Sequence, residues 1–483
     1  MKKDINKIVN TYSNMSAPVK ASIWFTVCSI IQKGITLLST PIFTRLLTTE
    51  QYGMYSVYQS WYSITSIFAT LNLSSGVLFN GLTNYPKDRK RVISSFQGLS
   101  TTVTLGLFVI YLIFSRFWNN LFGMGTLLMV AMFAELLVVP AYAFWAVKER
   151  YNYSYKLLIA LTLLVAFGSP VVGILAVLST SHKAEARVLS YVAIQIIQGI
   201  VFYIYNFKKG KCFFNKKYWK FALSFNLPLI PHYLSMTVLN QADRIMISNM
   251  VGTGAAAIYS VAYQVSMMMN IITTAINNSF VPYTYKEMKG HNYEGIKKNS
   301  NILLVLIGIL SVIAMAFGPE IIKIFADEEY YDAIWVIPPV AASVYFIFLY
   351  SLFANIEFYF EKTKFVMIAS CGGAVANIIL NYIFIPFFGY YAAGYTTLVC
   401  YIMFSFAHYY FHLRILKQHN EIGKIYSNKF IFGFSLLIIA FMLIMPMLYN
   451  TYIIRYSLIL VVIILAFIKR DFIITVFKGI KKK

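Results

Sequence analysis

Acidic residues are scarce in this chain of 483 residues, which has 18 Asp and Glu against 41 Lys and Arg and is only 12% charged. Cysteine is also rare: Cys28, Cys212, Cys371 and Cys400 have no paired spacing, so we expect neither a disulfide framework nor a metal site. The chain has no GxxxxGK[ST] phosphate loop, no HExxH and no GxSxG motif. ATP hydrolysis within the chain is therefore not expected, and no cofactor is predicted.

Apolar residues, in contrast, dominate the sequence. They make up 59% of the chain, and the mean hydropathy is +0.66, far above that of soluble proteins. Mainly apolar segments of about 20 residues or more can cross a bilayer as helices, and fourteen such segments occur here. They lie near residues 20–46, 53–81, 93–115, 121–147, 157–179, 187–206, 219–242, 254–282, 300–317, 332–358, 365–386, 390–413, 430–448 and 452–468.

Continuous segments of this length favour helices over the short alternating strands of a membrane barrel. The sequence therefore predicts an all-α polytopic membrane protein with fourteen transmembrane helices. The first apolar segment carries Lys33 and has no cleavage site, so we expect it to be retained rather than removed as a signal peptide.

The net charge is +23, and the basic residues that produce it are concentrated in the predicted loops. If the N-terminus is cytoplasmic, 33 of the 41 Lys and Arg residues lie in cytoplasmic segments, at every second loop, as the positive-inside rule requires. The basic excess thus indicates topology and not a nucleic-acid partner. Both termini are predicted to lie in the cytoplasm.

Two passages suggest an internal repeat. TRLLTTEQYGMYSVYQSWYSI follows the first span and DRIMISNMVGTGAAAIYSVAYQVSMM follows the seventh. Each has an Arg at a helix end, a Gly-containing turn and then YSV; the arginines Arg45 and Arg244 are 199 residues apart, and the tyrosines Tyr55 and Tyr259 are 204 apart. Both copies begin on the cytoplasmic side, so the repeat is parallel. It predicts two pseudo-symmetric six-helix lobes and an appended helix pair, with boundaries at 1–206, 207–415 and 416–483.

Polar residues form stripes at helical spacing on the predicted spans. Positions three and four apart share a helix face, and the stripe on the first span has Lys33 near mid-bilayer. Such stripes are also common as packing surfaces between membrane helices. A buried cation, however, costs roughly 2.5–3.5 kcal/mol at the bilayer centre, which favours a hydrated cavity. The predicted lining residues are Thr36, Thr40, Gln59, Asn226, Thr237, Asn240, Asn270 and Asn277.

Three cations, Lys33, Arg45 and Arg244, would make this cavity strongly positive and suited to phosphate. Asp243 precedes Arg244 by one residue, about 100° around the helix, so it could hold a neighbouring helix while Arg244 points into the cavity. An ion pair with a purely structural role is the alternative for these two residues. Glu135 lies deep in a span and is a candidate for proton coupling, or else a hydrogen-bonded packing acid.

Other polar residues within spans are assigned structural roles. His232 and His408 are expected to be hydrogen-bonded packing residues. Glu357 is expected to reach the headgroups or to pair with Lys362. Four prolines within spans, Pro140, Pro228, Pro231 and Pro282, can kink them.

The whole chain resembles the Wzx-type oligosaccharide repeat-unit flippases of the multidrug/oligosaccharidyl-lipid/polysaccharide (MOP) exporter superfamily. The resemblance rests on the six-plus-six repeat, on RLLTTEQYGMYSVY after the first span and on DRIMISNMVGTGAAAIYSVAY after the seventh. The resemblance implies two lobes in a V shape and transport by alternating access. It also implies that Lys33, Arg45 and Arg244 bind the headgroup of an undecaprenyl-diphosphate-linked oligosaccharide.

From the resemblance we expect export of this glycolipid to the outer leaflet of the bacterial cytoplasmic membrane for capsule, O-antigen or exopolysaccharide assembly. The expected partners are membrane lipid and, within such a pathway, a polysaccharide polymerase and a chain-length regulator; the protein itself is expected to be a monomer. A lipid II flippase and a cation-coupled drug exporter are alternatives in the same superfamily. A membrane-embedded polysaccharide polymerase or glycosyltransferase is the enzyme alternative, but the chain has no large outer loop with catalytic carboxylates.

Overall fold

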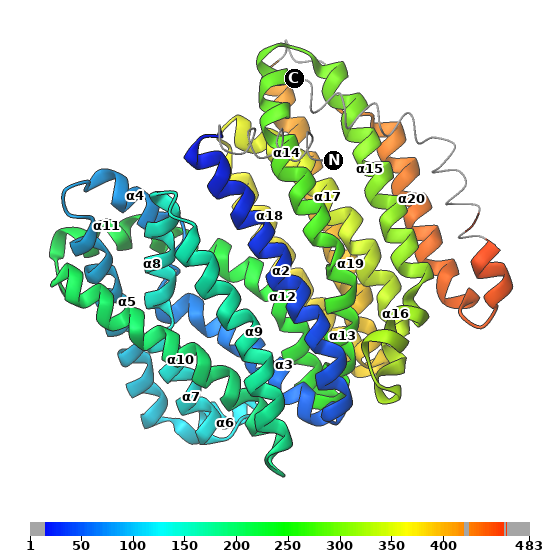
Figure 1. The fold of residues 1–483 in the computed structure, drawn as a ribbon. Helices are drawn as coiled ribbons and strands as arrows, with labels where there is room; N and C mark the ends of the chain where they lie inside the picture. Colours follow the sequence, from blue (N-terminus) through cyan, green and yellow to red (C-terminus); the bar gives the residue numbers. More distant parts are fainter. Residues whose placement is uncertain (1–14, 420–424, 458–459, 461–483) are drawn as a thin grey trace, which may run out of the picture. The chain divides into compact units, whose positions relative to one another are not determined.

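Helices account for the regular structure throughout the residues that the computed structural model describes, which are 15–419, 425–457 and 460 (Figure 1). Within these ranges ten helices are long and apolar enough to cross a membrane. The prediction of an all-helical, multi-pass membrane protein is confirmed. The fourteenth predicted span, 452–468, falls largely outside the described residues.

The chain divides into two compact units. Unit 1 comprises the described residues up to Leu47 together with Val57–Leu234, and unit 2 comprises Thr48–Ser56 and the described residues from Ser235 onward. The boundary between the two predicted lobes, at 206/207, stays a prediction.

Unit 1 is built around α10, which packs against α5, α7, α8 and α9. Gly199 lets α10 approach α7 closely, because an added Cβ would lie only 2.8 Å from the carbonyl carbon of Val138. A second apolar cluster joins α4, α5, α8 and α11 through side chains such as Phe96, Phe144 and Tyr218. The helices that lie wholly or mainly in this unit are α2 (Ala17–Leu46), α3 (Thr49–Thr70), α4 (Val77–Asn84), α5 (Arg89–Ile113), α6 (Ser115–Phe122), α7 (Thr126–Val138), α8 (Pro140–Tyr151), α9 (Lys156–Leu178), α10 (Lys183–Gly210), α11 (Lys216–Asn226) and the 3-10 turn η1 (Leu227–Leu229).

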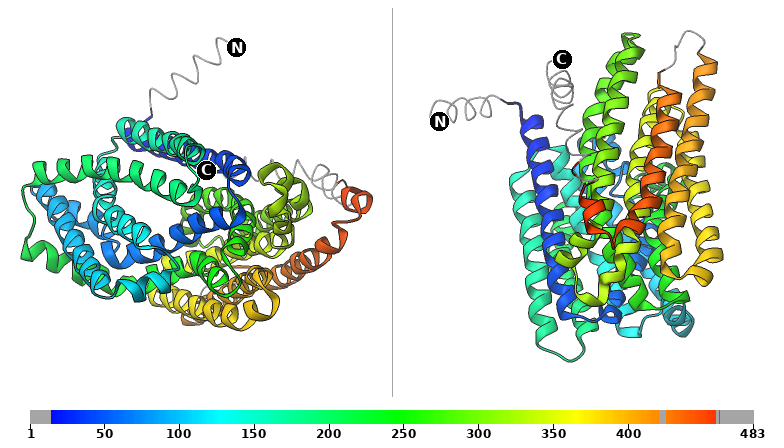
Figure 2. Two further views of the ribbon diagram at one scale, coloured as in Figure 1. Left: turned by 90° about the horizontal axis from the view of Figure 1, so that it is seen from below. Right: turned by 90° about the vertical axis from the view of Figure 1, so that its right-hand side faces the viewer.

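Unit 2 is built around α17, which is apolar on nearly all sides and packs against α13, α14, α15, α19 and α20. Helices α14 and α15 run side by side, as do α18 and α19 (Figure 2). The elements of this unit are α12 (Ile230–Met250), α13 (Thr253–Met267), α14 (Met269–Lys289), α15 (Tyr293–Ala316), α16 (Gly318–Phe325), η2 (Glu328–Trp335), α17 (Ile337–Tyr359), α18 (Thr363–Phe388), α19 (Tyr390–Gln418), α20 (Asn428–Ile444) and η3 (Met445–Leu448).

Two helix starts in the first half of the chain recur in the second half at one offset. Helix α3 begins at Thr49 and α13 at Thr253, 204 residues later. Helix α5 begins at Arg89 and α15 at Tyr293, again 204 residues later. The two YSV sequences are separated by the same 204 residues. The starts of α5 and α15 lie outside the two passages that contain YSV, so the offset is not limited to those passages.

Several predicted spans are interrupted, and two of the breaks have a clear backbone cause. The prediction of one helix over 53–81 is wrong, because α3 ends at Thr70 and the chain turns through positive φ angles at Leu71, Asn72 and Gly76 before α4. The span predicted over 219–242 is broken by η1, where Pro228 lacks the N–H that a continuous helix needs. The periodicity of apolar residues does not predict these breaks, because the apolar spacing continues through them.

The first turns of α3 belong to unit 2. Gly53 lies so close to α13 that an added Cβ would be 2.0 Å from the carbonyl oxygen of Thr253. Tyr52 packs edge-on against Tyr330 of η2, with ring centroids 6.0 Å apart, and the Tyr330 hydroxyl donates to the carbonyl of Thr48 at 3.3 Å. A segment of the first half of the chain is thus part of the packing of unit 2.

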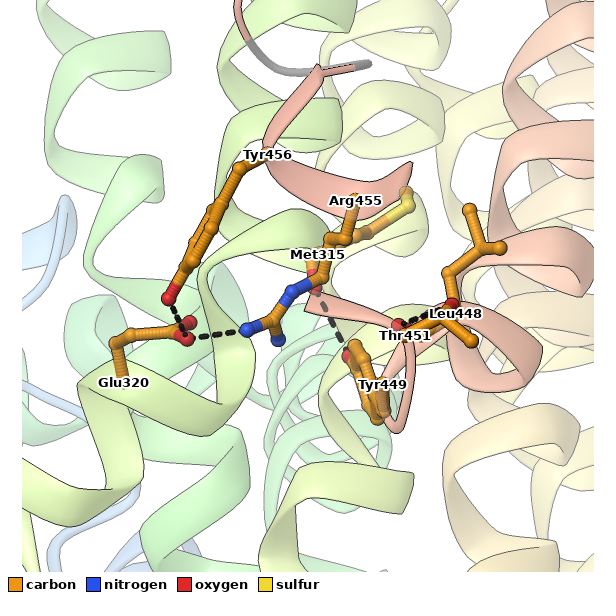
Figure 3. Close-up of polar contacts among 7 residues, drawn as sticks. All are labelled: Met315, Glu320, Leu448, Tyr449, Thr451, Arg455 and Tyr456. Carbon is orange, nitrogen blue, oxygen red and sulfur yellow. Dashed lines mark hydrogen bonds and ion pairs between the residues drawn. The ribbon is translucent and has the colours of Figure 1, made fainter. Parts of the chain in front are cut away.

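The end of the described chain is tied to unit 2 by an ion pair. Arg455, whose side chain is fully buried, bonds Glu320 of α16, and Tyr456 donates to the same Glu320 oxygen at 2.7 Å (Figure 3). The Tyr449 hydroxyl donates to the carbonyl of Met315 at 2.9 Å. These contacts fix the segment after η3 to α15 and α16.

Candidate functional site

Asp243 lies at the centre of a fully buried polar network in unit 2. One carboxylate oxygen, Oδ1, accepts from the side-chain amides of Asn377 at 3.2 Å and Asn381 at 2.6 Å. The other, Oδ2, accepts from the hydroxyls of Tyr259 at 2.5 Å and Thr397 at 2.9 Å. Helices α13, α18 and α19 therefore meet α12 at this carboxylate, and four neutral donors compensate its charge.

Arg244, the next residue, is directed away from this network. Its Nη1 donates to the carbonyl of Asn240, one turn earlier, at 2.6 Å and to Oε1 of Gln241 at 3.3 Å. The guanidinium carbon lies 4.5 Å from the ring centroid of Tyr263, whose hydroxyl donates to Oδ1 of Asn240 at 3.0 Å. The half-buried guanidinium is thus held on an aromatic face and does not pair with Asp243.

Arg45, its repeat counterpart, has the same local geometry in unit 1. Its Nη1 donates to the carbonyl of Pro41, one turn earlier on α2, at 2.9 Å. Arg45 and Lys33 are both exposed, whereas Thr40 on the same helix is buried. Helix α2 contacts α9 of unit 1. The structure places Lys33 and Arg45 in unit 1 and Arg244 in unit 2.

Glu135 is the buried carboxyl of unit 1. It is 1% exposed and accepts from the hydroxyl of Tyr58, which is also buried, at 2.8 Å. Tyr62 and Tyr191 are the other titratable side chains near this pair. A tyrosine hydroxyl on another helix thus donates to Glu135, whereas two amides and two hydroxyls donate to Asp243.

The predicted lining residues occupy different environments. Asn226 is buried and donates to the carbonyl of Leu71, which ties α11 to the turn after α3 within unit 1. Asn277 accepts from the amide of Asn355 at 2.9 Å within unit 2. Of the remaining six, Thr36 is exposed, Thr40 is buried and Gln59, Thr237, Asn240 and Asn270 are half-buried.

The prediction for Glu357 is wrong. This side chain is fully buried, and its Oε1 bonds Nδ1 of His408 on α19 at 2.8 Å, so it neither reaches the headgroups nor pairs with Lys362. The same contact bonds Nδ1 of His408, as expected for a packing residue, but leaves Nε2 of the buried ring without a partner among the described residues. In the sequence, Glu357 lies near the end of its predicted span, where a side chain can reach the headgroups. The sequence does not show that α19 packs alongside this end and covers the side chain.

Comparison with known sequences identifies the family. The profile of the polysaccharide biosynthesis protein family matches residues 19–288, more than half of the chain. The chain belongs to the polysaccharide biosynthesis protein family. The MatE profile matches residues 228–383. A protein of the Lsg locus of Haemophilus influenzae is 24% identical over 363 residues, which cover 72% of this chain and 86% of that protein.

Solved structures show the fold of this family member. The lipid II flippase MurJ in an inward closed conformation matches with a TM-score of 0.70, 16% identity and coverage of 93% of this chain and all of that chain. An inward-facing MATE family multidrug transporter of the MOP superfamily matches with a TM-score of 0.58 and 13% identity, over 83% of this chain and 99% of that one. The chain thus shares its fold with these transporters.

The partners of Asp243 in this polysaccharide biosynthesis protein were missed in the sequence. Asn377 and Asn381 are one helical turn apart in ANIILN, and Thr396 and Thr397 face them from α19. A pair of amides four residues apart in an otherwise apolar span was the available signal. Among the described residues no cluster of three or more His, Cys, Asp or Glu side chains could hold a metal ion.

Proposed function

We propose that this protein is a flippase that moves undecaprenyl-diphosphate-linked oligosaccharide repeat units from the cytoplasmic to the outer leaflet of the bacterial cytoplasmic membrane. The match to the polysaccharide biosynthesis family carries this proposal. The products of such transport would feed capsule, O-antigen or exopolysaccharide assembly. Transport would proceed by alternating access of two lobes, with both termini in the cytoplasm.

In this proposal Lys33, Arg45 and Arg244 bind the diphosphate. The two arginines are counterparts in the predicted repeat, and each is tethered through Nη1 to the carbonyl one turn earlier. A guanidinium fixed in this way keeps its planar fork oriented, which suits it to phosphate oxygens. The polyprenyl tail would remain in lipid while the sugars cross in a hydrated cavity.

Of the two buried carboxyl groups in this proposal, Glu135 couples transport to protons and Asp243 holds a helix in place. Outward movement of two negative charges is favoured by roughly 2.3 kcal/mol per charge per 100 mV in an inside-negative cell, so the membrane potential could drive export. A proton on Glu135 would reset the carrier. Asp243 would keep α12, which carries Arg244, in register with α13, α18 and α19.

The test uses a strain that lacks the gene and makes a surface polysaccharide that depends on it. Complementation with Lys33→Ala, Arg45→Ala or Arg244→Ala should reduce surface polymer at least several-fold and cause lipid-linked repeat units to accumulate in the inner leaflet, at unchanged protein levels. Arg116→Ala, which alters an exposed arginine on α6, is the matched control. Normal polymer output in all three variants would refute the headgroup assignment.

The same strain separates the alternatives. Lysis without loss of surface polymer would indicate a lipid II flippase, and increased sensitivity to organic cations alone would indicate a drug exporter. Polymerisation by the purified protein would indicate an enzyme. Blue-native electrophoresis and co-purification would test the expected monomer and an association with a polymerase or a chain-length regulator.

A further inference from the structure

A second buried acid in unit 2 is not used by the proposed mechanism. Glu357 lies two residues before the end of α17, and His408 lies in the body of α19. Both side chains are 0% exposed, and Oε1 of Glu357 is 2.8 Å from Nδ1 of His408. Polar groups buried this deeply are normally bonded at every atom.

This pair, unlike Asp243, leaves polar atoms without a partner. Oε2 of Glu357 and Nε2 of His408 are both buried and make no hydrogen bond to any described residue. With the proton on Nδ1, Nε2 is an acceptor without a donor; with protons on both nitrogens, Nε2–H is a donor without an acceptor. No single protonation state satisfies the pair, whereas both oxygens of Asp243 are bonded twice.

The surroundings give the pair no compensating charge. Tyr350 of α17 stacks on the His408 ring at 5.4 Å, and Phe404 packs edge-on at 4.6 Å. The other titratable groups nearby are Tyr401 and His412 of α19 and Tyr426 before α20. In the described parts of the helices packed on α17 and α19, no Lys, Arg, Asp or other Glu interacts with Glu357.

We propose that Glu357 and His408 together form a proton-binding site of unit 2, separate from Glu135 and from the Asp243 network. A carboxylate beside a neutral imidazole has a net charge of −1, and binding one proton brings the pair to zero, either as carboxylic acid and imidazole or as carboxylate and imidazolium. A net charge away from water is strongly disfavoured. The pair therefore holds its proton when closed and releases it when water reaches Oε2 and Nε2.

This behaviour connects proton occupancy to the hydration of the space between α17 and α19. A conformation that opens this space releases a proton from unit 2, and one that closes it takes a proton up. The proton binding stands on the geometry alone, while its connection to glycolipid export rests on the proposed function.

The test is a histidine titration of the full-length protein in liposomes, with no transported substrate present. In nitrogen NMR of 15N-histidine-labelled protein, the His408 signal, assigned by its loss in His408→Gln, should change as the pH is varied over the range in which the protein stays folded. Glu357→Gln should shift the midpoint of that change. A His408 signal that does not move over this range, or that moves identically in Glu357→Gln, would overturn the proposal.

Hydrogen–deuterium exchange of α17 and α19 provides the second readout. After correction for intrinsic rates, wild-type protein should be more protected at pH about 5.5 than at about 8. The double variant Glu357→Gln/His408→Gln keeps an amide–amide hydrogen bond without a titratable group, so it should fold and lose this difference. His419→Gln, at the end of the same helix, should retain it.

The swapped variant Glu357→His/His408→Glu restores a titratable pair and should recover the pH-dependent protection. Protection that depends on pH in the double Gln variant would show a purely structural contact. Since none of these measurements involves a glycolipid, the proton site can fail while the flippase assignment stands, and the reverse also holds.

Discussion

Asp243 in unit 2 and Glu135 in unit 1 are both buried acids, yet they are satisfied in different ways. Asp243 accepts from four neutral donors on three helices, while Glu135 accepts from Tyr58. Four donors can stabilise a carboxylate away from water, and they also fix the helices that carry them. A single donor stabilises the charge less and joins fewer helices. Burial of a carboxyl group therefore does not define its role, which depends on the number and origin of its donors.

Removing each carboxyl tests this difference most strongly. Asp243→Ala removes the acceptor that four buried donors share, and an unsatisfied buried donor costs about 1–3 kcal/mol, so we expect unit 2 to lose roughly 3 kcal/mol or more of unfolding free energy. Glu135→Ala leaves one donor and should cost less. Denaturant or thermal unfolding of the purified proteins measures both, with the exposed Asn249→Ala as control. Equal losses would mean that the donor count is irrelevant.

Glu320 provides a third case, because its carboxylate is paired with a cation, Arg455, and not only with neutral donors. Arg455→Ala leaves Glu320 without its ion pair; breaking a fully buried pair costs about 3–5 kcal/mol, but Glu320 is 29% exposed and can turn to water. We therefore expect a loss of about 2 kcal/mol. Arg455→Glu with Glu320→Arg should recover part of it, and no recovery would show that packing of the Arg455 side chain is responsible.

Removing one tyrosine hydroxyl from each network gives a smaller effect. Tyr58→Phe takes from Glu135 its tyrosine donor and should lower stability by about 1.5 kcal/mol. Tyr259→Phe leaves Asp243 with three donors and should cost about 1 kcal/mol or less. If Tyr259→Phe proved the more damaging variant, the Asp243 network would depend on that one donor.

The smallest effect on stability is expected for Glu135→Gln. The amide oxygen can still accept from Tyr58, so unfolding should change by no more than about 0.5 kcal/mol. Transport in inverted vesicles should nevertheless lose its dependence on the pH gradient, because glutamine cannot bind a proton. Unchanged gradient dependence would remove Glu135 from the proposed coupling.

Much of the fold follows from the sequence because apolar length and charge placement act locally. The span positions, the repeat and the membrane class could all be predicted from windows of the sequence. The interruption at Leu71–Gly76 could not, since the apolar pattern runs through it, whereas Pro228 marked the second break as a position where a helix can kink. Asn377, Asn381 and Thr397 were missed because their role depends on contacts across about 130–150 residues of sequence with Asp243.

The unit boundaries have a consequence for how the protein can be divided. Unit 2 includes Thr48–Ser56 from the first half of the chain, and unit 1 includes residues 207–234 from the second. A gene split between codons 206 and 207 would thus encode two fragments, each bearing a piece of the other's core. Neither fragment should be stable when produced alone, and the two should complement each other when produced in the same cell.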